Sequence, residues 1–166
     1  MLPAAVNQRQ IDEISQTWRL MMLTVNDLMT VNPKTVSPQT TLREVIDLMQ
    51  EEECRQFPVV NAQGKLMGIV TDRDVRLTMN SPIVLHERWQ DDALLETMTV
   101  ESCMTPNPLT VSPDTPAYHA AEMLSAYKFG ALPVVDDGRL VGIVTITDFL
   151  NHFAEFKPVI VNGKQV

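Results

Sequence analysis

The hydrophobic pattern of this chain predicts one order of elements, and that order occurs twice. In the first copy, a segment with apolar residues at helical spacing precedes two short apolar runs, Phe57–Val60 and Leu66–Thr71, that are typical of strands. In the second copy, the same pattern precedes Leu132–Val135 and Leu140–Thr145. Polar residues with a glycine separate the two runs of each pair, which predicts two hairpins. Each second strand then leads into another predicted helix.

The starts of the predicted helices are marked by particular residues. Thr41 opens a Thr-x-x-Glu capping box, so we predict that the first helix begins there. In the second copy we predict Thr115 as the cap and Pro116 as the first helical residue. The apolar faces of these two helices are made of Leu42, Val45, Ile46 and Met49, and of Ala117, Ala120, Ala121 and Leu124. The helices after the second strands are predicted to begin near Asp72 and Thr147.

The two copies also share their residues. Val25–Pro38 returns as Val100–Pro113 at an offset of 75, and Gly68–Asp74 returns as Gly142–Asp148 at an offset of 74. A repeat of this kind cannot bury its apolar face alone, and the other copy is its natural partner. The sequence therefore predicts an α+β fold of two pseudo-symmetric units. Gly68 and Gly142 lie inside predicted strands, where glycine permits close backbone approach.

This pattern divides the 166 residues into five parts. In chain order, they are an N-terminal helical extension (1–23), the first repeat (24–80), an acidic inter-repeat insertion (81–99), the second repeat (100–156) and a C-terminal tail (157–166). We expect the insertion to be partly helical and docked by Trp89, Leu94 and Leu95.

Composition and charge remove several classes of function. The net charge of -8 argues against a general nucleic-acid surface, and no apolar run approaches the roughly 20 residues of a membrane span. We therefore expect a cytoplasmic protein with neither nucleic acid nor membrane as partner. Cys54 and Cys103 are expected to be reduced, and the three histidines have no metal-ligand spacing. No nucleophile–base arrangement is found, so we expect no enzyme activity and no catalytic cofactor.

Four signatures occur twice and in the same order: Met-Thr-x-x-Pro, Thr-Val-Ser-Pro, x-Pro-Val-Val and Gly-Ile-Val-Thr-x-x-Asp. Residues 24–156 thereby resemble a pair of CBS (cystathionine-beta-synthase) domains, known as a Bateman module. The resemblance implies two β-α-β-β-α units packed sheet to sheet with two clefts between them. It also implies an adenosine-containing ligand, a homodimer and a regulated partner protein. We also expect an extra N-terminal helix in addition to this fold.

Two Thr-x-x-Asp pairs lie where a strand is predicted to become a helix. They are Thr71 with Asp74 and Thr145 with Asp148. An ionised aspartate there can accept the hydroxyls of a ribose, and the threonine with the N–H groups of the helix start can hold phosphate. The alternative is an ordinary helix cap, in which the acidic residue favours the helix dipole. The resemblance assigns the same positions to ribose and phosphate.

The resemblance also implies that each cleft combines one such pair with strand residues of the other repeat. The first set is Thr145, Asp148, Lys34, Thr35, Val36, Arg55, Gln56 and Phe57. The second set is Thr71, Asp74, Leu109, Thr110, Val111, Gly130, Ala131 and Leu132, with Arg73 beside them. We predict that the Asp148 cleft is the better phosphate site, because Lys34 and Arg55 have no basic counterpart at the matching positions. Plain surface charges are the alternative for both residues.

Two hypotheses for the function follow. In the first, the chain is a stand-alone regulatory module that binds an adenine nucleotide, with AMP, ADP or ATP favoured over NAD or S-adenosylmethionine, and signals to a partner protein. In the second, ligand binding has lapsed, and the chain is a protein-interaction or dimerisation module.

Overall fold

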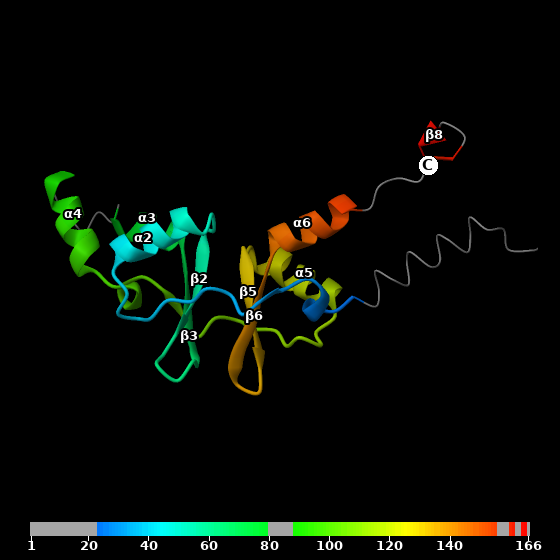
Figure 1. Cartoon of the computed structure of the whole chain (residues 1–166), viewed down its shortest axis with the longest axis horizontal. Coiled ribbons are helices and arrows are strands. Elements are labelled where there is room, and N and C mark those ends of the chain that lie inside the picture. Colours follow the sequence, from blue (N-terminus) through cyan, green and yellow to red (C-terminus); the bar gives the residue numbers. More distant parts are fainter. Residues whose placement is uncertain (1–22, 80–87, 156–159, 162–163, 166) are drawn as a thin grey trace, which may run out of the picture.

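The structure is a computed structural model that describes residues 23–79, 88–155, 160–161 and 164–165. The predicted N-terminal helix and Phe156, the last residue of the predicted second repeat, lie outside the described residues. Mixed helices and strands confirm the α+β class. Figure 1 shows two hairpins side by side in the middle of the molecule, with helices toward its two ends.

The strands form two three-stranded antiparallel sheets with equivalent orders, β2-β3-β4 and β1-β6-β5. Their bounds are β1 Thr30–Val31, β2 Gln56–Val60, β3 Leu66–Thr71, β4 Thr105–Pro106, β5 Ala131–Asp136 and β6 Arg139–Thr145. A short separate hairpin is made of β7 Ile160–Val161 and β8 Lys164–Gln165. The predicted hairpins are confirmed as β2–β3 and β5–β6.

The helices follow the predicted order. Their bounds are α2 Leu42–Glu51, α3 Asp72–Met79, α4 Arg88–Thr97, α5 Ala117–Tyr127 and α6 Ile146–Glu155. Two 3-10 turns, η1 Val25–Asp27 and η2 Val100–Ser102, begin the segments that precede α2 and α5, and we call these two segments the leads of the repeats. In Figure 1, α2, α3 and α4 lie at one end of the molecule, and α5 and α6 lie at the other.

Each repeat gives its lead to the sheet of the other repeat. Strand β1 pairs with β6, and β4 pairs with β3. The 3-10 turns also pack in the other repeat: Val25 is completely buried in the core of the second repeat, and Val100 in the core of the first. Figure 1 shows the lead of the first repeat passing from α5 and β6 toward α2. The two repeats are thereby tied together by backbone hydrogen bonds.

The core is split into two clusters, one for each end of the molecule. The first consists of Val36, Leu42, Val45, Phe57, Val59, Val70, Val75 and Val100. The second consists of Val25, Val111, Ala120, Leu124, Leu132, Val134 and Val144. Both clusters combine one face of a helix with the inner face of a hairpin. The predicted apolar faces of α2 and α5 are the faces that supply these buried residues.

One predicted helix cap is confirmed and the other is wrong. Oγ1 of Thr41 accepts the backbone N–H of Glu44, and Glu44 completes the capping box. In the second repeat, α5 begins at Ala117 with Pro116 as its N-cap. Pro116 is the equivalent of Thr41, and its ring carries no acceptor. Thr115 lies one residue earlier and instead accepts the N–H of Ser112 at 3.0 Å.

The predicted role of the strand glycines is confirmed. A Cβ atom on Gly68 would lie 2.9 Å from the carbonyl oxygen of Thr105, and one on Gly142 would lie 3.1 Å from that of Thr30. Both carbonyls belong to the exchanged leads. Glycine at these two positions therefore lets each lead approach the other repeat's hairpin.

The insertion between the repeats contains helix α4, as predicted. Arg43 of α2 forms ion pairs with Asp92 and Glu96 of α4, the latter at 3.3 Å. Leu95 packs against the core of the first repeat. These contacts attach α4 to α2. The side chain of Trp89 lies outside the described ones.

Candidate functional site

The two Thr-x-x-Asp pairs have nearly identical geometry at the junctions of β3 with α3 and of β6 with α6. The backbone N–H and the hydroxyl of Thr71 donate to Oδ2 of Asp74 at 2.9 and 2.7 Å. Those of Thr145 donate to Oδ2 of Asp148 at 2.7 and 2.8 Å. In return, each threonine Oγ1 accepts the N–H of the aspartate. Each pair is a reciprocal cap of its helix.

The cap leaves part of each carboxylate available for a ligand. Oδ2 of Asp74 and of Asp148 is held by the threonine, whereas Oδ1 accepts no hydrogen bond from the described residues. A carboxylate has about four acceptor positions, so both aspartates keep the capacity to accept ligand hydroxyls. Capping and ligand binding are therefore compatible at these positions. The cap also fixes the direction in which each carboxylate presents Oδ1.

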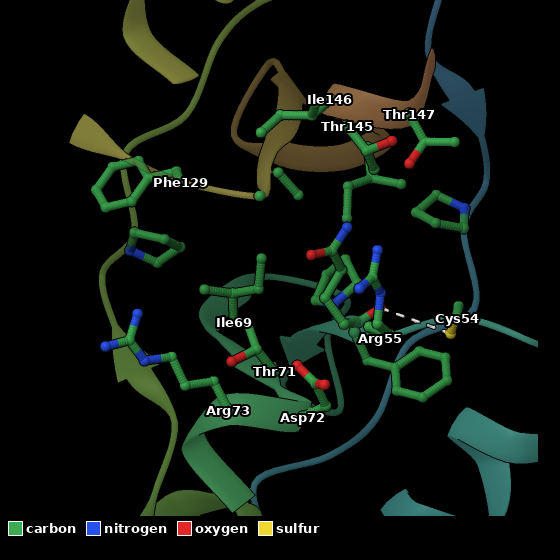
Figure 2. A pocket seen from close by; sticks show the side chains of 18 of the residues that line it. Cys54, Arg55, Ile69, Thr71, Asp72, Arg73, Phe129, Thr145, Ile146 and Thr147 are labelled. Atoms are coloured by element: carbon green, nitrogen blue, oxygen red, sulfur yellow. Dashed lines mark hydrogen bonds between the residues drawn. The ribbon is translucent and has the colours of Figure 1, made fainter. Parts of the chain in front are cut away.

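Both pairs face a single cavity of about 1210 Å³ between the repeats. Figure 2 shows Thr71 and Thr145 on opposite walls, and side chains of both repeats project between them. Drug-sized ligands occupy pockets of roughly 300–1,000 Å³, so the cavity is large enough for a nucleotide. The two clefts expected from the sequence are thus joined into one space.

The structure brings twelve of the seventeen predicted site residues to this cavity. They are Lys34, Arg55, Gln56, Phe57, Thr71, Arg73, Asp74, Leu109, Gly130, Ala131, Thr145 and Asp148. Thr35, Val36 and Val111 are not among the lining residues. The side chains of Val36 and Val111 are buried in the two cores, because these residues form bridges with Val59 and Val134. Thr110 and Leu132 are likewise outside the lining.

The two repeats approach each other inside the cavity at Gln56 and Gly130. A Cβ atom on Gly130 would lie 3.1 Å from Oε1 of Gln56. The amide side chain of the first repeat therefore lies against the backbone of the second. A Cβ atom at residue 130 would require the end of the Gln56 side chain to shift by a few tenths of an ångström.

One predicted cation is already paired. Nζ of Lys34 lies 2.9 Å from Oε1 of Glu52, which also lines the cavity. The hydrogen bond to Glu52 raises the pKa of the Lys34 ammonium, and the charge of Glu52 adds to this effect. A phosphate group must compete with Glu52 for this lysine.

Three consecutive lining residues were not predicted: Tyr127, Lys128 and Phe129. The rings of Tyr127 and Phe129 are stacked, with centroids 5.5 Å apart and planes at 15°. Lys128 between them has a left-handed backbone (φ 59°) and ends α5. The signal in the sequence was their place directly before Gly130 and Ala131, which were predicted to line a cleft.

Cys103 is a partly buried residue that is close enough to Asp74 to be affected by its charge. Burial raises the pKa of its thiol to about 11, and the negative charge of Asp74 adds to the shift. Cys103 packs against the core of the first repeat. Its thiol is therefore protonated at neutral pH.

The described residues contain neither a cluster of metal ligands nor a helix that could span a membrane. Within 23–79, 88–155 and the short C-terminal hairpin, no three His, Cys, Asp or Glu side chains come together as metal ligands. No helix in the same part of the chain has the length and hydrophobicity needed to cross a bilayer.

Comparison with known proteins identifies the family. The CBS domain model matches residues 25–81 and 100–155, and the chain belongs to the CBS domain family, with two domains in tandem. A CBS domain-containing protein of Dictyostelium discoideum is 35% identical over 132 residues, which are 79% of this chain and 91% of that protein. Several longer curated proteins are matched over between 17% and 25% of their length.

Solved structures have the same fold. CBSX2 of Arabidopsis thaliana, in a structure described as a complex with AMP, is 32% identical with a TM-score of 0.66 over 80% of this chain and 96% of that chain. The CBS domain pair of protein MJ0100, described as a complex with 5'-methylthioadenosine and S-adenosyl-L-methionine, is 30% identical with a TM-score of 0.67 over 79% and 99%. Both are CBS pairs, which confirms the predicted tandem arrangement.

Proposed function

We propose that this chain is a stand-alone regulatory module that binds an adenine nucleotide between its two CBS repeats and signals to a partner protein. The observation that carries the proposal is the pair of capped aspartates, Asp74 and Asp148, facing one cavity. Each carboxylate has Oδ1 available, and ribose hydroxyls are the donors that such an acceptor fits. The AMP, ADP and ATP class is favoured.

The ligands of related proteins support this class of ligand. AMP, 5'-methylthioadenosine and S-adenosyl-L-methionine, which occur in the two related complexes, all contain adenosine. NAD contains it as well. These compounds differ in their 5' substituents, so a panel of them separates recognition of adenosine from recognition of phosphate.

A regulatory role is supported by the way the cavity is built. Its walls come from both repeats, and Gln56 touches Gly130 across them. A ligand that fits one spacing of the repeats better than another shifts the population toward that spacing. We place this switch in the cytoplasm, with the shifted population read by an unidentified partner protein.

A second candidate function, an interaction or dimerisation module, is favoured by the exposed face of α6. Phe153 is 59% exposed, Leu150, which also lines the cavity, is 62% exposed, and Tyr118 of the neighbouring α5 is 64% exposed. Exposed large apolar side chains on neighbouring helices are typical of an interface. We propose a homodimer through α5 and α6, and sedimentation velocity of the purified chain tests it.

Nucleotide binding is tested by thermal unfolding and calorimetry with AMP, ADP, ATP with and without magnesium, NAD and S-adenosylmethionine. The variants are Asp74→Ala and Asp148→Ala. Both lose a helix cap as well as a ligand contact, so a matched control is needed. Asp27→Ala is that control, because Oδ2 of Asp27 accepts the N–H and hydroxyl of Thr24 at 2.8 Å each, and Asp27 is not among the cavity's lining residues.

The proposal predicts a specific pattern among these proteins. A ligand at 100 times its Kd adds about 2.7 kcal/mol to the free energy of unfolding of the wild type. Asp27→Ala lowers the unfolding temperature of the free protein but keeps this gain. At least one of the two cavity variants loses it. A wild-type protein that gains no stability from any of these compounds, after bound ligand has been removed, contradicts nucleotide binding and favours the interaction module.

A further inference from the structure

Pseudo-symmetry allows the two sides of the cavity to be compared position by position. We call one the Cys54 side, made of Lys34, Glu52, Glu53, Cys54 and Arg55. We call the other the Phe129 side, made of the equivalent residues Leu109, Tyr127, Lys128, Phe129 and Gly130. The Cys54 side thus has two basic and two acidic residues. The Phe129 side has one basic residue and no acidic residue at these positions.

Arg73 adds a second positive charge to the Phe129 side. It lies in the first turn of α3, directly before Asp74, and its equivalent in the second repeat is the uncharged Thr147. In Figure 2 the Arg73 side chain points toward the side of the cavity where Phe129 lies, away from Cys54 and Arg55. Asp72 beside it also lines the cavity, and its equivalent is the uncharged Ile146, so the Phe129 side has one positive charge more than the Cys54 side.

The basic residues of the two sides also differ in whether an acidic residue of the protein already binds them. Lys34 on the Cys54 side is held by Glu52 at 2.9 Å, and Glu53 lies next to Glu52 in the chain. Among the described residues, neither Arg73 nor Lys128 takes part in an ion pair. Arg55 likewise forms no ion pair within the described part of the chain, but it shares its side of the cavity with the two glutamates.

The Phe129 side also offers an aromatic surface beside its cations. Tyr127 is 58% exposed and Phe129 37% exposed, although both are large apolar side chains. They form a stacked pair whose position on the cavity wall leaves ring surface for a ligand. Bases stack on such rings, and in a nucleotide the ribose joins the base to the phosphate.

We propose that a bound nucleotide places its phosphate on the Phe129 side, held by Arg73 and Lys128, with Phe129 and Tyr127 as the adjoining wall. The proposal rests on the proposed function and reverses the side expected from Lys34 and Arg55 in the sequence. Lys34 is the cation with the strongest internal competitor, because a phosphate must displace Glu52 from it. Arg73 and Lys128 meet a phosphate without breaking an ion pair among the described residues.

The test compares AMP with adenosine, which has the same base and ribose but no phosphate. Calorimetry is performed on the full chain with two matched double variants, R73Q/K128Q and K34Q/R55Q. Each removes two positive charges and keeps polar side chains of similar length. We expect R73Q/K128Q to weaken AMP by about fivefold per charge, or roughly 25-fold, because a unit charge at about 4 Å in water contributes this much. Adenosine affinity is expected to change less than about twofold.

The comparison variant K34Q/R55Q removes the same number of charges from the other side of the cavity, and it is expected to weaken AMP less than R73Q/K128Q does. A third variant, Lys128→Glu, recreates the acidic residue that the first repeat has at this position. Its backbone fits the change, since Glu53 and Lys128 both have left-handed φ angles, 49° and 59°. We expect Lys128→Glu to weaken AMP more than Lys128→Gln does, with adenosine binding retained as evidence of an intact cavity.

Several results overturn the assignment. One is a larger AMP loss in K34Q/R55Q than in R73Q/K128Q, and another is an equal loss in both. A parallel loss of adenosine and AMP affinity in R73Q/K128Q shows a structural role rather than a phosphate contact. In all three cases nucleotide binding itself stands. If the wild-type protein binds neither AMP nor adenosine, that result contradicts both the proposed function and this assignment.

Discussion

Gly68 is the position at which the exchange of leads leaves little room for a side chain. A Cβ atom there would lie 2.9 Å from the carbonyl oxygen of Thr105 and 2.7 Å from Sδ of Met104. The Met104 side chain can rotate away. The Thr105 carbonyl belongs to β4, which is paired with β3, so it moves only if that pairing opens. We therefore predict that Gly68→Ala destabilises the protein.

The size of the effect follows from two opposing contributions. Overpacking a filled site costs about 1–3 kcal/mol. Replacing glycine reduces the entropy of the unfolded chain, which offsets about 0.4–1 kcal/mol of this cost. The net loss in the free energy of unfolding is about 0–2.6 kcal/mol, or up to roughly 10 °C in unfolding temperature for a chain of this size.

Urea and thermal unfolding of Gly68→Ala measure this loss, and two comparisons identify its source. Met104→Ala is introduced into both backgrounds as a double-mutant cycle. If the Thr105 carbonyl is the obstacle, the cost of Gly68→Ala persists when Met104 is truncated. Gly142→Ala is expected to lose less, since its Cβ would lie 3.1 Å from the nearest backbone oxygen. A Gly68→Ala protein at least as stable as the wild type refutes the close packing of the exchanged lead.

Two further substitutions probe the core and the buried thiol. Leu132→Ala, at a completely buried position of the second core, is expected to lower the free energy of unfolding by about 2–5 kcal/mol in urea, and a loss below about 1 kcal/mol contradicts the packing described. The pKa of Cys103, raised from 9.0 to about 11, means that the folded state keeps the thiol proton to higher pH. Its contribution to stability is therefore full below pH 9 and lost as pH rises toward 11. Unfolding at pH 8 and 10.5 should show a steeper decline for the wild type than for Cys103→Ala, and equal slopes contradict the shift.

Local patterns were sufficient to predict the order of elements. The apolar runs Phe57–Val60 and Leu66–Thr71 match the bounds of β2 and β3 to within one residue, because polar turn residues separate the two runs. The capping box at Thr41 fixed the start of α2. The same reasoning failed at Thr115, where the structural equivalent of the cap is a proline one residue later.

Long-range pairing was less accessible to sequence reasoning. A repeat shows which residues are equivalent but does not show whether a lead joins its own repeat's sheet or that of the other repeat. The exchange depends on backbone hydrogen bonds such as that from Asn32 N–H to the Val141 carbonyl oxygen at 3.0 Å. Gly68 and Gly142 indicated that another backbone segment approaches the strand closely, but they did not show which segment it is.

In the candidate site, too, local features could be predicted from the sequence, whereas long-range contacts could not. Asp74 and Asp148 were predicted because a Thr-x-x-Asp pair carries its geometry within four residues. Val36 and Val111 were predicted from the resemblance, yet their side chains belong to the cores. The aromatic pair around Lys128 was missed because its position depends on where α5 ends. Likewise, the competition of Glu52 for Lys34 depends on contacts between the lead and the end of α2.

The most direct test of the central claim is a crystal structure of the chain grown with AMP. Binding of AMP in the cavity between the repeats predicts its electron density there, with a ribose oxygen within hydrogen-bonding distance of Oδ1 of Asp74 or Asp148. AMP bound elsewhere on the surface, or in the cavity without contact to either carboxylate, contradicts the account.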